Sequence, residues 1–365
     1  STRKESSAAS DVYKRQSKSN AMKQKLTISD VAKEVGASIS TVSVALSGRP
    51  GVSDKRRAEI QRAAFEMGYR PDRQAALIRL ERTHLIGVVF YMEQEFQISL
   101  MDPLFRYAEK QGYRLVATGC VGQRSEMDCI ESLMQDRCEG IVLIGTRLSA
   151  EYLEKIAAVI PLITLCQEVG SHSVDAVVSN DAYGISKSFE HLWQKGFRDI
   201  VHIRGDNQTN ANVREATFKQ CLADRGLAAD DSSSLRIYQG GQNLGDGARV
   251  ADQILRQVSN GERVMPRAVI CFNDLCAQGF MIRMWQEGVH IPQEIAVVGF
   301  DDTPIASEPY VELTTVRQDR EELASLAVER LVEHVEFFFD KENYGKKWDA
   351  VEKQVETRLI VRKTA

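Results

Sequence analysis

The sequence predicts an α/β protein in two parts, a small all-α helix-turn-helix unit followed by a larger unit of two α/β lobes. Three observations lead to this prediction. The stretch Thr27 to Leu46 has two short apolar stripes at helical spacing on either side of Gly36. Beyond His84, short apolar runs alternate with amphipathic helical patterns over two successive stretches of about 100 residues each. The 365 residues, with a hydrophobic content of 43%, suffice for the cores of several domains.

The first 21 residues are polar and show no periodic pattern. Ser19, Asn20 and Ala21 stand before Met22 like a remnant of cloning, so we expect residues 1–21 to be a disordered tail outside the fold. We expect the helix-turn-helix domain over residues 22–68, a hinge helix and linker over 69–83, and the two-lobed domain over 84–365.

The first two helices flank Gly36, which can take the positive φ of a sharp reversal. Thr27, with Asp30 three residues later, is typical of a capping box, and Ser38 with Thr41 can cap the second helix. A helix-turn-helix places its second helix in the DNA major groove, N-terminal residues first. The candidate base readers are therefore Ile39, Ser40, Ser43 and Val44.

A third helix is expected after Ser53, a plausible N-cap, and before Gly68. Its apolar face consists of Ile60, Ala63, Ala64 and Met67. Lys55, Arg56 and Arg57 near its start form either a solvated face or contacts to DNA phosphates. Beside a helix-turn-helix we expect at least one of the three to contact phosphate.

The charge of the chain is unevenly distributed. Between Met22 and Arg82 there are twelve basic and seven acidic residues, a net charge of +5, whereas the whole chain has −4. A basic module on an acidic body indicates a polyanionic partner for that module alone.

The larger part reads as parallel sheets covered on both faces, because its strands are continuous apolar runs separated by helices. The expected strands are 85–90, 114–118, 141–144, 162–165, 200–203, 268–272 and 295–300. The expected helices include 100–111, 185–195, 213–225, 248–257 and 275–286. A further helix, 320–338, has Leu323, Leu326, Ala327 and Leu331 at helical spacing. This apolar face could pack in the core or form a dimer surface, and we favour the core.

Polar residues follow several of these strands, at the edge where open α/β sheets bind ligands. They are Gln167, Asn273, Asp274, Asp301 and Asp302, and Arg214 opens a helix nearby. An arginine fork, a carboxylate and an amide suit a small ligand rich in hydrogen-bonding groups. Structural alternatives are a helix cap for Asp274, a turn for Asp301 and a surface ion pair for Arg214.

Other classes of function find little support. The seven cysteines include no CxxC pair and favour free thiols in a reducing cytoplasm. No apolar run approaches membrane-spanning length and no signal peptide is recognisable. The six scattered histidines, with no GxSxG, P-loop or HExxH motif, indicate no enzyme, no metal and no cofactor. The Gly245-Asp246-Gly247 segment is better explained as a helix start than as a phosphate loop.

Several motifs, taken in order, resemble one family. The runs DVAKEVGASISTVSVALSG and VSDKRRAEIQRAAFEMGYRP are similar to the headpiece of the lactose-repressor (LacI/GalR) family of transcription regulators. The resemblance continues through VVSNDAYG, HLWQKGFRDIVHIRG, CFNDLCAQG, IAVVGFDDT and LTTVRQD, and it covers essentially everything after Met22.

The resemblance implies a periplasmic-binding-protein-like effector domain whose chain crosses three times between the lobes. The first lobe would comprise about 84–180 and 318–345, and the second about 181–317 and 346–365. In the family the hinge helix inserts an apolar wedge into the minor groove, a position held here by Ile78. The expected DNA-contacting set is Thr27, Ser38, Ile39, Ser40, Thr41, Ser43, Val44, Ser53, Arg73 and Ile78.

The resemblance also assigns effector contacts. Arg214, Asn273, Asp301 and Gln318 match effector-contacting positions of the family, and Gln167 completes the polar set. Two positions depart from the family pattern. Val44 stands where Arg or Lys usually reads a base, and Gln242 stands where an aromatic ring commonly stacks on the effector.

The function expected is that of a cytoplasmic, homodimeric, sequence-specific transcription regulator, a repressor by preference. It would bind a pseudo-palindromic operator under the control of a small effector, a sugar or sugar derivative. Two alternatives remain at this stage: a two-lobed small-molecule receptor without a DNA role, and a regulator controlled by a protein partner.

Overall fold

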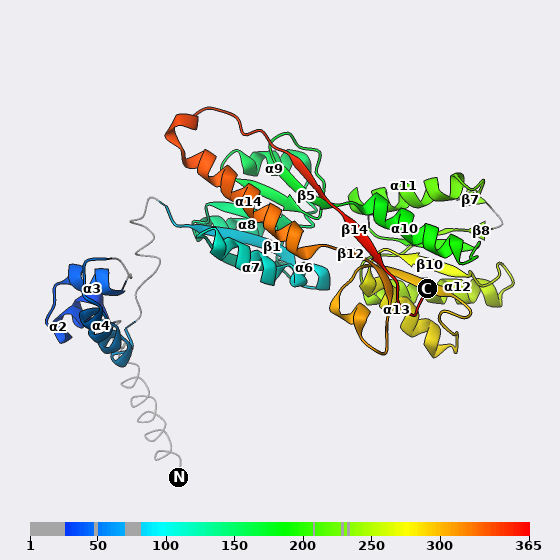
Figure 1. The fold of residues 1–365 in the computed structure, drawn as a ribbon, viewed down its shortest axis with the longest axis horizontal. Coiled ribbons are helices and arrows are strands. Elements are labelled where there is room, and N and C mark those ends of the chain that lie inside the picture. The colour runs from blue at the N-terminus through cyan, green and yellow to red at the C-terminus, as the bar shows by residue number, and fades with distance from the viewer. Residues whose placement is uncertain (1–25, 47–49, 70–81, 207–208, 228–229, 232–233) are drawn as a thin grey trace, which may run out of the picture. The chain divides into compact units, whose positions relative to one another are not determined.

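The computed structural model describes residues 26–46, 50–69, 82–206, 209–227, 230–231 and 234–365 (Figure 1). The chain divides into two compact units, residues 1–81 and 82–365, and each is described by itself. The expected tail and most of the expected hinge helix, with Arg73 and Ile78, lie outside the described residues.

The first unit, the headpiece, contains the three expected helices. They are α2 (Ile28–Glu34), α3 (Ile39–Leu46) and α4 (Asp54–Glu66). Thr27 and Asp30 form the capping box of α2, and the Ser53 side chain accepts a hydrogen bond from the Arg56 amide. Gly36 has a φ of +59°, so the turn between α2 and α3 uses the left-handed conformation that glycine adopts at no steric cost.

The headpiece core is small and built from all three helices. Its most buried members, none more than 4% exposed, are Val31, Ala32, Val42, Ala45, Ile60 and Ala64. Met67 packs against this cluster while half-buried. The apolar stripes read from the sequence therefore face one another, as a three-helix core requires.

The second unit, the effector unit, begins with a six-stranded, wholly parallel sheet in the order β13-β5-β4-β3-β1-β2. The strands of this first lobe are β1 (Leu85–Tyr91), β2 (Arg114–Cys120), β3 (Gly140–Ile144), β4 (Leu162–Leu165), β5 (Asp175–Ser179) and β13 (Glu352–Val355). Its helices are α6 (Glu95–Ser99), α7 (Met101–Lys110), α8 (Glu126–Gln135), α9 (Ala150–Ala157), α14 (Arg320–Phe339) and the short 3-10 helix η2 (Lys341–Asn343).

Helices α7 and α14 pack together over one face of this sheet, and α8 and α9 contact it outside that cluster. Leu323, Ala327 and Leu331 of α14 are fully buried, and Leu326 packs against the same cluster while half-buried. The preference for core over dimer surface on this helix is thus confirmed for three of its four apolar positions.

The second lobe has its own six-stranded sheet, in the order β14-β12-β11-β10-β6-β9. Its strands are β6 (Ile200–Arg204), β9 (Ile237–Gln239), β10 (Ala268–Cys271), β11 (Ala296–Asp301), β12 (Thr314–Gln318) and β14 (Thr357–Ile360), and a separate hairpin joins β7 (Asp230–Asp231) to β8 (Ser234–Leu235). The helices are α10 (Asp181–Gln194), α11 (Thr209–Ala223), α12 (Leu244–Ser259), α13 (Asp274–Gln286) and the 3-10 helix η1 (Pro304–Ser307). Within the six-stranded sheet only β14 runs antiparallel to its neighbour, and β7 pairs antiparallel with β8 outside that sheet.

Helices α12 and α13 approach each other unusually closely. A Cβ added to Gly247 would lie 1.9 Å from the Cys276 carbonyl oxygen, and one added to Gly279 would lie 1.9 Å from that of Leu244. Asn243 and Asp246 form the capping box of α12. The Gly245-Asp246-Gly247 segment is therefore a helix start, and its second glycine is needed for helix packing.

The chain passes between the two sheets three times, after β5, after β12 and between β13 and β14. Figure 1 shows the last crossing as one extended red segment that joins the lobes. The expectation that 346–365 belongs to the second lobe is wrong for its first part. Strand β13 pairs with β5 in the first sheet, and only β14 joins the second. Only Val355 of β13 is buried, so the apolar pattern of this segment did not distinguish one sheet from the other.

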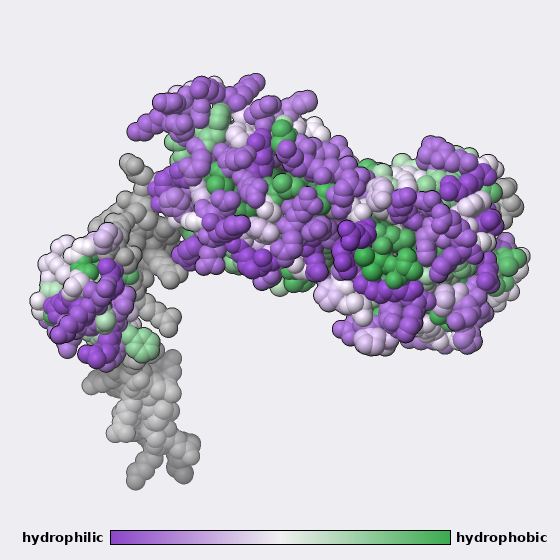
Figure 2. Space-filling view, in the orientation of Figure 1, coloured by the Kyte–Doolittle hydropathy of each residue, from purple (hydrophilic) through white to green (hydrophobic). Residues whose placement is uncertain are grey.

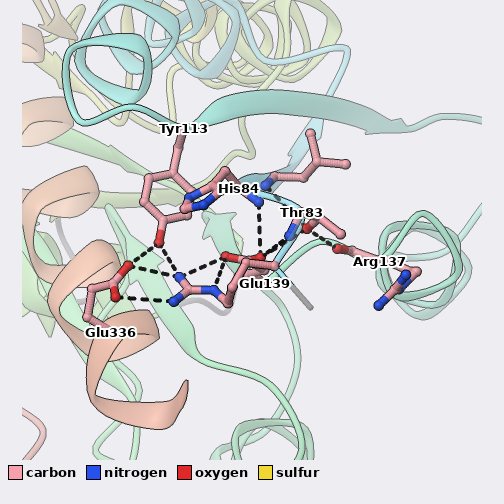
Figure 3. A network of polar contacts seen from close by, with 8 residues as sticks. Thr83, His84, Tyr113, Arg137, Glu139 and Glu336 are labelled. Atoms are coloured by element: carbon pink, nitrogen blue, oxygen red, sulfur yellow. Dashed lines mark hydrogen bonds and ion pairs between the residues drawn. The ribbon is translucent and has the colours of Figure 1, made fainter. Parts of the chain in front are cut away.

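The start of the effector unit is held by Arg82 (Figure 3). Its guanidinium contacts Glu139 Oε2 at 3.0 Å and Glu336 Oε1 at 2.8 Å, and donates to the Tyr113 hydroxyl at 2.7 Å. Glu139 also accepts the backbone amides of Thr83 and His84. These hydrogen bonds and the Arg82 ion pair lower the pKa of Glu139 despite its burial, and the Glu336 pKa falls to about 2.

Candidate functional site

Helix α3 presents an uncharged, small-residue surface. Ile39 is 52% exposed, Ser40 and Ser43 are exposed, and Thr41 and Val44 are half-buried. The buried face, Val42 and Ala45, points into the headpiece core. The candidate base readers thus occupy the accessible side of the helix, where DNA can be read by hydroxyls and apolar contacts only.

The polar residues at the helix starts are already engaged locally. Thr27 is the N-cap of α2, and the Ser38 hydroxyl accepts the Thr41 amide at 3.1 Å. Ser38 also shares hydrogen bonds with the hydroxyls of Ser40 and Thr41. These contacts fix the start of α3, and each hydroxyl remains on an exposed or half-exposed residue.

Two of the three basic residues near the start of α4 have structural roles. Arg56 donates from Nη2 to the Val35 carbonyl at the end of α2 at 2.6 Å, and Arg57 donates from Nη1 to the Ala45 carbonyl near the end of α3 at 3.4 Å. A cation at a helix C-terminus satisfies free carbonyls and complements the helix dipole. Lys55 is exposed and keeps the phosphate-contact interpretation.

A cavity of about 180 Å³ lies between the two lobes of the effector unit. It is bordered by residues that follow the carboxyl ends of strands in both sheets, the edge predicted for ligand binding. Its lining includes five of the six predicted effector residues: Arg214, Gln242, Asn273, Asp301 and Gln318. The structure therefore brings together side chains that are far apart in the sequence.

Arg214 is a buried cation, 3% exposed, and not a surface ion pair. Its guanidinium lies 3.1 Å from Asp181 Oδ1, donates to the Phe272 carbonyl at 2.6 Å, and stacks 3.6 Å from the Phe300 ring centroid. Its Nε has no hydrogen-bond partner among the described residues. The arginine is thus held in place by several contacts, and its Nε–H is unused beside the cavity.

Asp301 ends β11 with a φ of +116°, a conformation that non-glycine residues rarely adopt and that costs about 1–3 kcal/mol. Its Oδ1 accepts from Gln318 Nε2 at 2.6 Å, and Gln318 Oε1 in turn accepts from the Ser179 hydroxyl at 2.5 Å. Burial raises the pKa of Asp301 well above its ordinary value, and the Arg214 charge opposes this rise. The strained backbone aims a carboxylate at the cavity.

Asn273 and Gln242 join neighbouring segments of the second lobe. Asn273 caps α13 by accepting the Cys276 amide at 2.8 Å, and it donates to the Gln242 carbonyl at 3.0 Å. The Gln242 side chain donates to Asp206 at 3.2 Å. Across the cavity, Gln94 of the first lobe donates to Asn243 of the second at 3.2 Å. The lobes therefore touch at this side of the site.

Three other polar residues predicted near the cleft do not line the cavity. Gln167 is buried beside it and donates to the Glu168 carbonyl, while its Oε1 has no partner among the described residues. Asp274 is wholly buried and accepts from Thr303 and Thr315, and burial raises its pKa to about 7. Asp302 is paired with two arginines outside the cavity, so its role is structural.

Sequence reasoning missed several lining residues. Asp181, buried against Arg214, follows β5, a strand that was not among those expected. Cys166, with a φ of +62°, follows β4, and burial raises its thiol pKa. The signal for Cys166 was its place directly after an apolar strand, whereas Asp181 stands one residue further on, at the start of α10. Glu352, on β13, could be placed only once the pairing of β13 with the first sheet was known.

The described residues contain no helix long and apolar enough to cross a membrane. In the same residues, no group of three or more His, Cys, Asp or Glu side chains is arranged to hold a metal ion.

Comparisons with known proteins agree with this arrangement. The HTH-type transcriptional regulator DegA of Bacillus subtilis is 30% identical over 308 residues, covering 82% of this chain and 89% of DegA. The ribose operon repressor of Escherichia coli K12 is 29% identical, covering 85% of this chain and 93% of that repressor. The crystal structure of a LacI transcriptional regulator from a Rhodococcus species has a TM-score of 0.69 and 31% identity, covering 77% of this chain and 98% of that one.

A helix-turn-helix headpiece joined to a two-lobed unit with a polar cavity defines a DNA-binding transcription regulator controlled by a small effector. Residues 27–72 match the model of bacterial regulatory proteins of the lacI family, and residues 189–365 match that of a periplasmic-binding-protein-like domain. The chain belongs to the lacI family. The alternative of a receptor without a DNA role is thereby set aside.

Proposed function

We propose that this regulator represses transcription as a homodimer bound to a pseudo-palindromic operator, and that a carbohydrate-like effector in the cavity controls that binding. The observation that carries the proposal is the cavity itself, in which one arginine, four acidic side chains and several amides converge from both lobes. Such a set suits a small polyhydroxylated ligand, since each hydroxyl can donate and accept. The name of the Escherichia coli ribose operon repressor also supports sugar chemistry.

In this proposal α3 reads the operator. Ile39, Ser40, Ser43 and Val44 contact base edges, and Thr27, Ser38, Thr41 and Ser53 lie at helix starts, where hydroxyls and amides bind phosphate. Arg73 and Ile78 are proposed as contacts of the hinge. Because Val44 can offer only an apolar contact, a thymine methyl group is the base feature that it would favour.

The effector residues are proposed as Arg214, Asn273, Asp301, Gln318 and Gln242, with Gln167 supporting them from outside the cavity. An effector changes DNA affinity only if it binds one arrangement of the lobes better than another, with a coupling of typically about 1–3 kcal/mol. In the arrangement of the lobes seen in this structure, Gln94 of the first lobe donates a hydrogen bond to Asn243 of the second.

The effector unit retains exposed apolar side chains that a second copy could cover. Ile98 on α6 and Phe105 on α7 are 46% and 45% exposed, and Ile282 and Trp285 on α13 are 38% and 40% exposed. Figure 2 shows a further apolar patch on the visible face of the second lobe, near the position of β14 in Figure 1. Exposed apolar surface of this kind supports self-association.

The decisive experiment is an in vitro selection of bound genomic DNA with the full-length protein at two salt concentrations. Enrichment of a short palindromic motif is expected, and the neighbouring genes would indicate which metabolites to test. Only unspecific, strongly salt-dependent binding would contradict sequence-specific regulation by the free protein. A melting-temperature screen then distinguishes control by a metabolite from control by a protein partner. Stabilisation by a metabolite supports the cavity, whereas stabilisation by a cellular protein alone supports a protein partner.

A further inference from the structure

The charges around the cavity are unbalanced. Its described lining contains four acidic side chains and one basic side chain: Glu168, Asp181, Asp301 and Glu352 against Arg214. Acidic groups therefore outnumber basic groups in the described lining.

The single cation is already neutralised. Arg214 pairs with Asp181, donates to the Phe272 carbonyl and is covered by the rings of Phe272 and Phe300, 4.7 and 3.6 Å from their centroids. Only its Nε lacks a partner among the described residues. These contacts use two of its five N–H groups, and an anionic ligand would find no unpaired positive charge in the described lining.

The carboxylates, in contrast, have unused acceptors. Asp301 is 7% and Asp181 8% exposed, and in each only Oδ1 accepts a hydrogen bond from the described residues. The second oxygen of each is not among the buried atoms that lack a partner, so it is open to the cavity and can accept a hydrogen bond from a ligand. Two more carboxylates stand at exposed positions, and burial together with nearby Glu168 raises the pKa of Glu352.

We propose that the effector is a cationic, amine-bearing polyhydroxylated molecule such as an amino sugar, held through its ammonium group by Asp301 and Asp181 and attracted by Glu352 and Glu168. This inference rests on the proposed effector role of the cavity and narrows its ligand class. A charge-assisted hydrogen bond is about twice as strong as a neutral one, so the ammonium group should raise affinity about tenfold over a neutral group of similar size. A phosphorylated sugar meets net repulsion.

The test uses isothermal titration calorimetry of the full chain at neutral pH, where the amines are mostly protonated and the buried carboxyl groups, whose pKa is raised, are less protonated than in acid. D-glucosamine, D-galactosamine and D-mannosamine are each compared with the parent hexose, the N-acetylated form and the hexose 6-phosphate. At least one hexosamine should bind about tenfold more tightly than its three uncharged or anionic counterparts. Equal or tighter binding of a hexose or a phosphate, or no binding of any hexosamine, would overturn the proposal.

Two matched variants test whether the carboxylates of the cavity cause the preference for hexosamines. Glu352→Gln removes a carboxylate from the lining and should reduce the preference for the hexosamine several-fold. Glu356→Gln removes the same charge four residues away, on an exposed residue outside the lining, and should leave the preference unchanged. An equal loss in both variants would mean that overall charge, and not the cavity, sets the preference, and this too would overturn the proposal.

Operator selection in the absence of ligand tests the proposed regulatory function separately from the proposed ligand class. If the protein enriches a palindromic motif but shows no preference for the amines, the ligand class is wrong and the regulatory function stands. If it enriches no motif, the proposed function fails first.

Discussion

Asp301 and Asp302 are adjacent in the chain, yet their carboxylates serve different structures. Asp301 faces the cavity and accepts only from Gln318, whereas Asp302 binds Arg317 and Arg362 at 2.6 Å each. Both residues have positive φ, and this pair of unusual conformations turns the two side chains apart.

The first prediction uses this pair. Asp301→Asn should weaken effector binding at least about tenfold while changing the free energy of unfolding by less than about 1 kcal/mol, because a buried, poorly solvated carboxylate becomes a neutral amide of the same shape. Asp302→Asn should leave effector affinity intact but cost about 1–3 kcal/mol of stability, since Arg362 loses its charged partner. Calorimetric titration and urea unfolding measure both. A reversal of the two effects would move the binding role to Asp302.

The second prediction concerns Arg82. Arg82→Met leaves the Glu139 carboxylate, whose side chain is 3% exposed, without its cation, so the free energy of unfolding of the effector unit should fall by about 3 kcal/mol. Arg106→Met is the control, because Arg106 pairs with Asp102 and Glu321 at the surface, where ion pairs add little stability, so its loss should cost much less than that of Arg82. Similar losses in the two variants would show that the network around Arg82 adds little stability.

The third prediction is a pH dependence. Burial lowers the pKa of His202 to about 4, below its ordinary value of 6.5. Between pH 6.5 and 4, His202 is therefore protonated in the unfolded chain but not in the folded protein. The free energy of unfolding thus decreases as the pH falls, by about 2–3 kcal/mol for this residue. His202→Gln should flatten the stability profile in that window, and His172→Gln, at an exposed position, should not.

The measurement must compare each variant with the parent protein. Buried Asp274 has its pKa raised to about 7, so its contribution runs in the opposite direction over much of the same range. Subtracting the parent profile removes that contribution. A His202→Gln profile parallel to the parent between pH 6.5 and 4 would mean that His202 accepts a proton in the folded protein.

The fourth prediction separates the basic residues of α4. Lys55→Gln should reduce the slope of log affinity against log salt by about 0.9, the loss of one phosphate contact, without changing stability. Arg56→Met should instead destabilise the headpiece by about 1–2 kcal/mol, because the Val35 carbonyl at the end of α2 loses its donor. If Lys55→Gln leaves the salt slope unchanged, Lys55 belongs to the solvated face.

The fifth prediction concerns Val44. Val44→Arg gives α3 a side chain that can bind guanine with two hydrogen bonds, so the selected half-site should change, with a discrimination of about 1–3 kcal/mol at one base pair. Effector affinity should be the same as in the parent protein. Selection of an unchanged motif would remove Val44 from the base-reading set.

The sequence predicted the parts of the fold that have one dominant pattern. All three headpiece helices and the seven expected strands occur close to where they were expected, because each helix buries an apolar stripe and six of the strands, all but β2, bury most of their residues. The fully buried strand β5 was nevertheless missed. Strands β12 and β14 were missed because their residues, TTVRQ and TRLI, mix polar with apolar side chains. Their place in the sheet depends on pairing with distant segments, which periodicity does not encode.

The candidate site likewise contains residues that the sequence could predict and contacts that it could not. Asn273 and Asp301 could be predicted because they follow or end recognisable strands. Arg214 was expected at the start of a helix, whereas α11 begins five residues earlier, at Thr209. The partner of Arg214 could not be predicted, since Asp181 lies 33 positions earlier and the ion pair depends on tertiary packing. For the same reason, Arg56 and Arg57 looked like phosphate ligands in the sequence, and only the folded headpiece places them against the ends of α2 and α3.

The final crossing between the lobes has a consequence for synthesis on the ribosome. Strands β13 and β14 complete the first and the second sheet, respectively, with Glu356 alone between them. The headpiece emerges early and needs no later residue for its core, whereas neither lobe can acquire its edge strand until the segment 352–360 has been made. A chain that stalls before this segment has a complete headpiece, but each of its two lobes lacks an edge strand. Translation of the last strands thus decides when the whole effector unit can form.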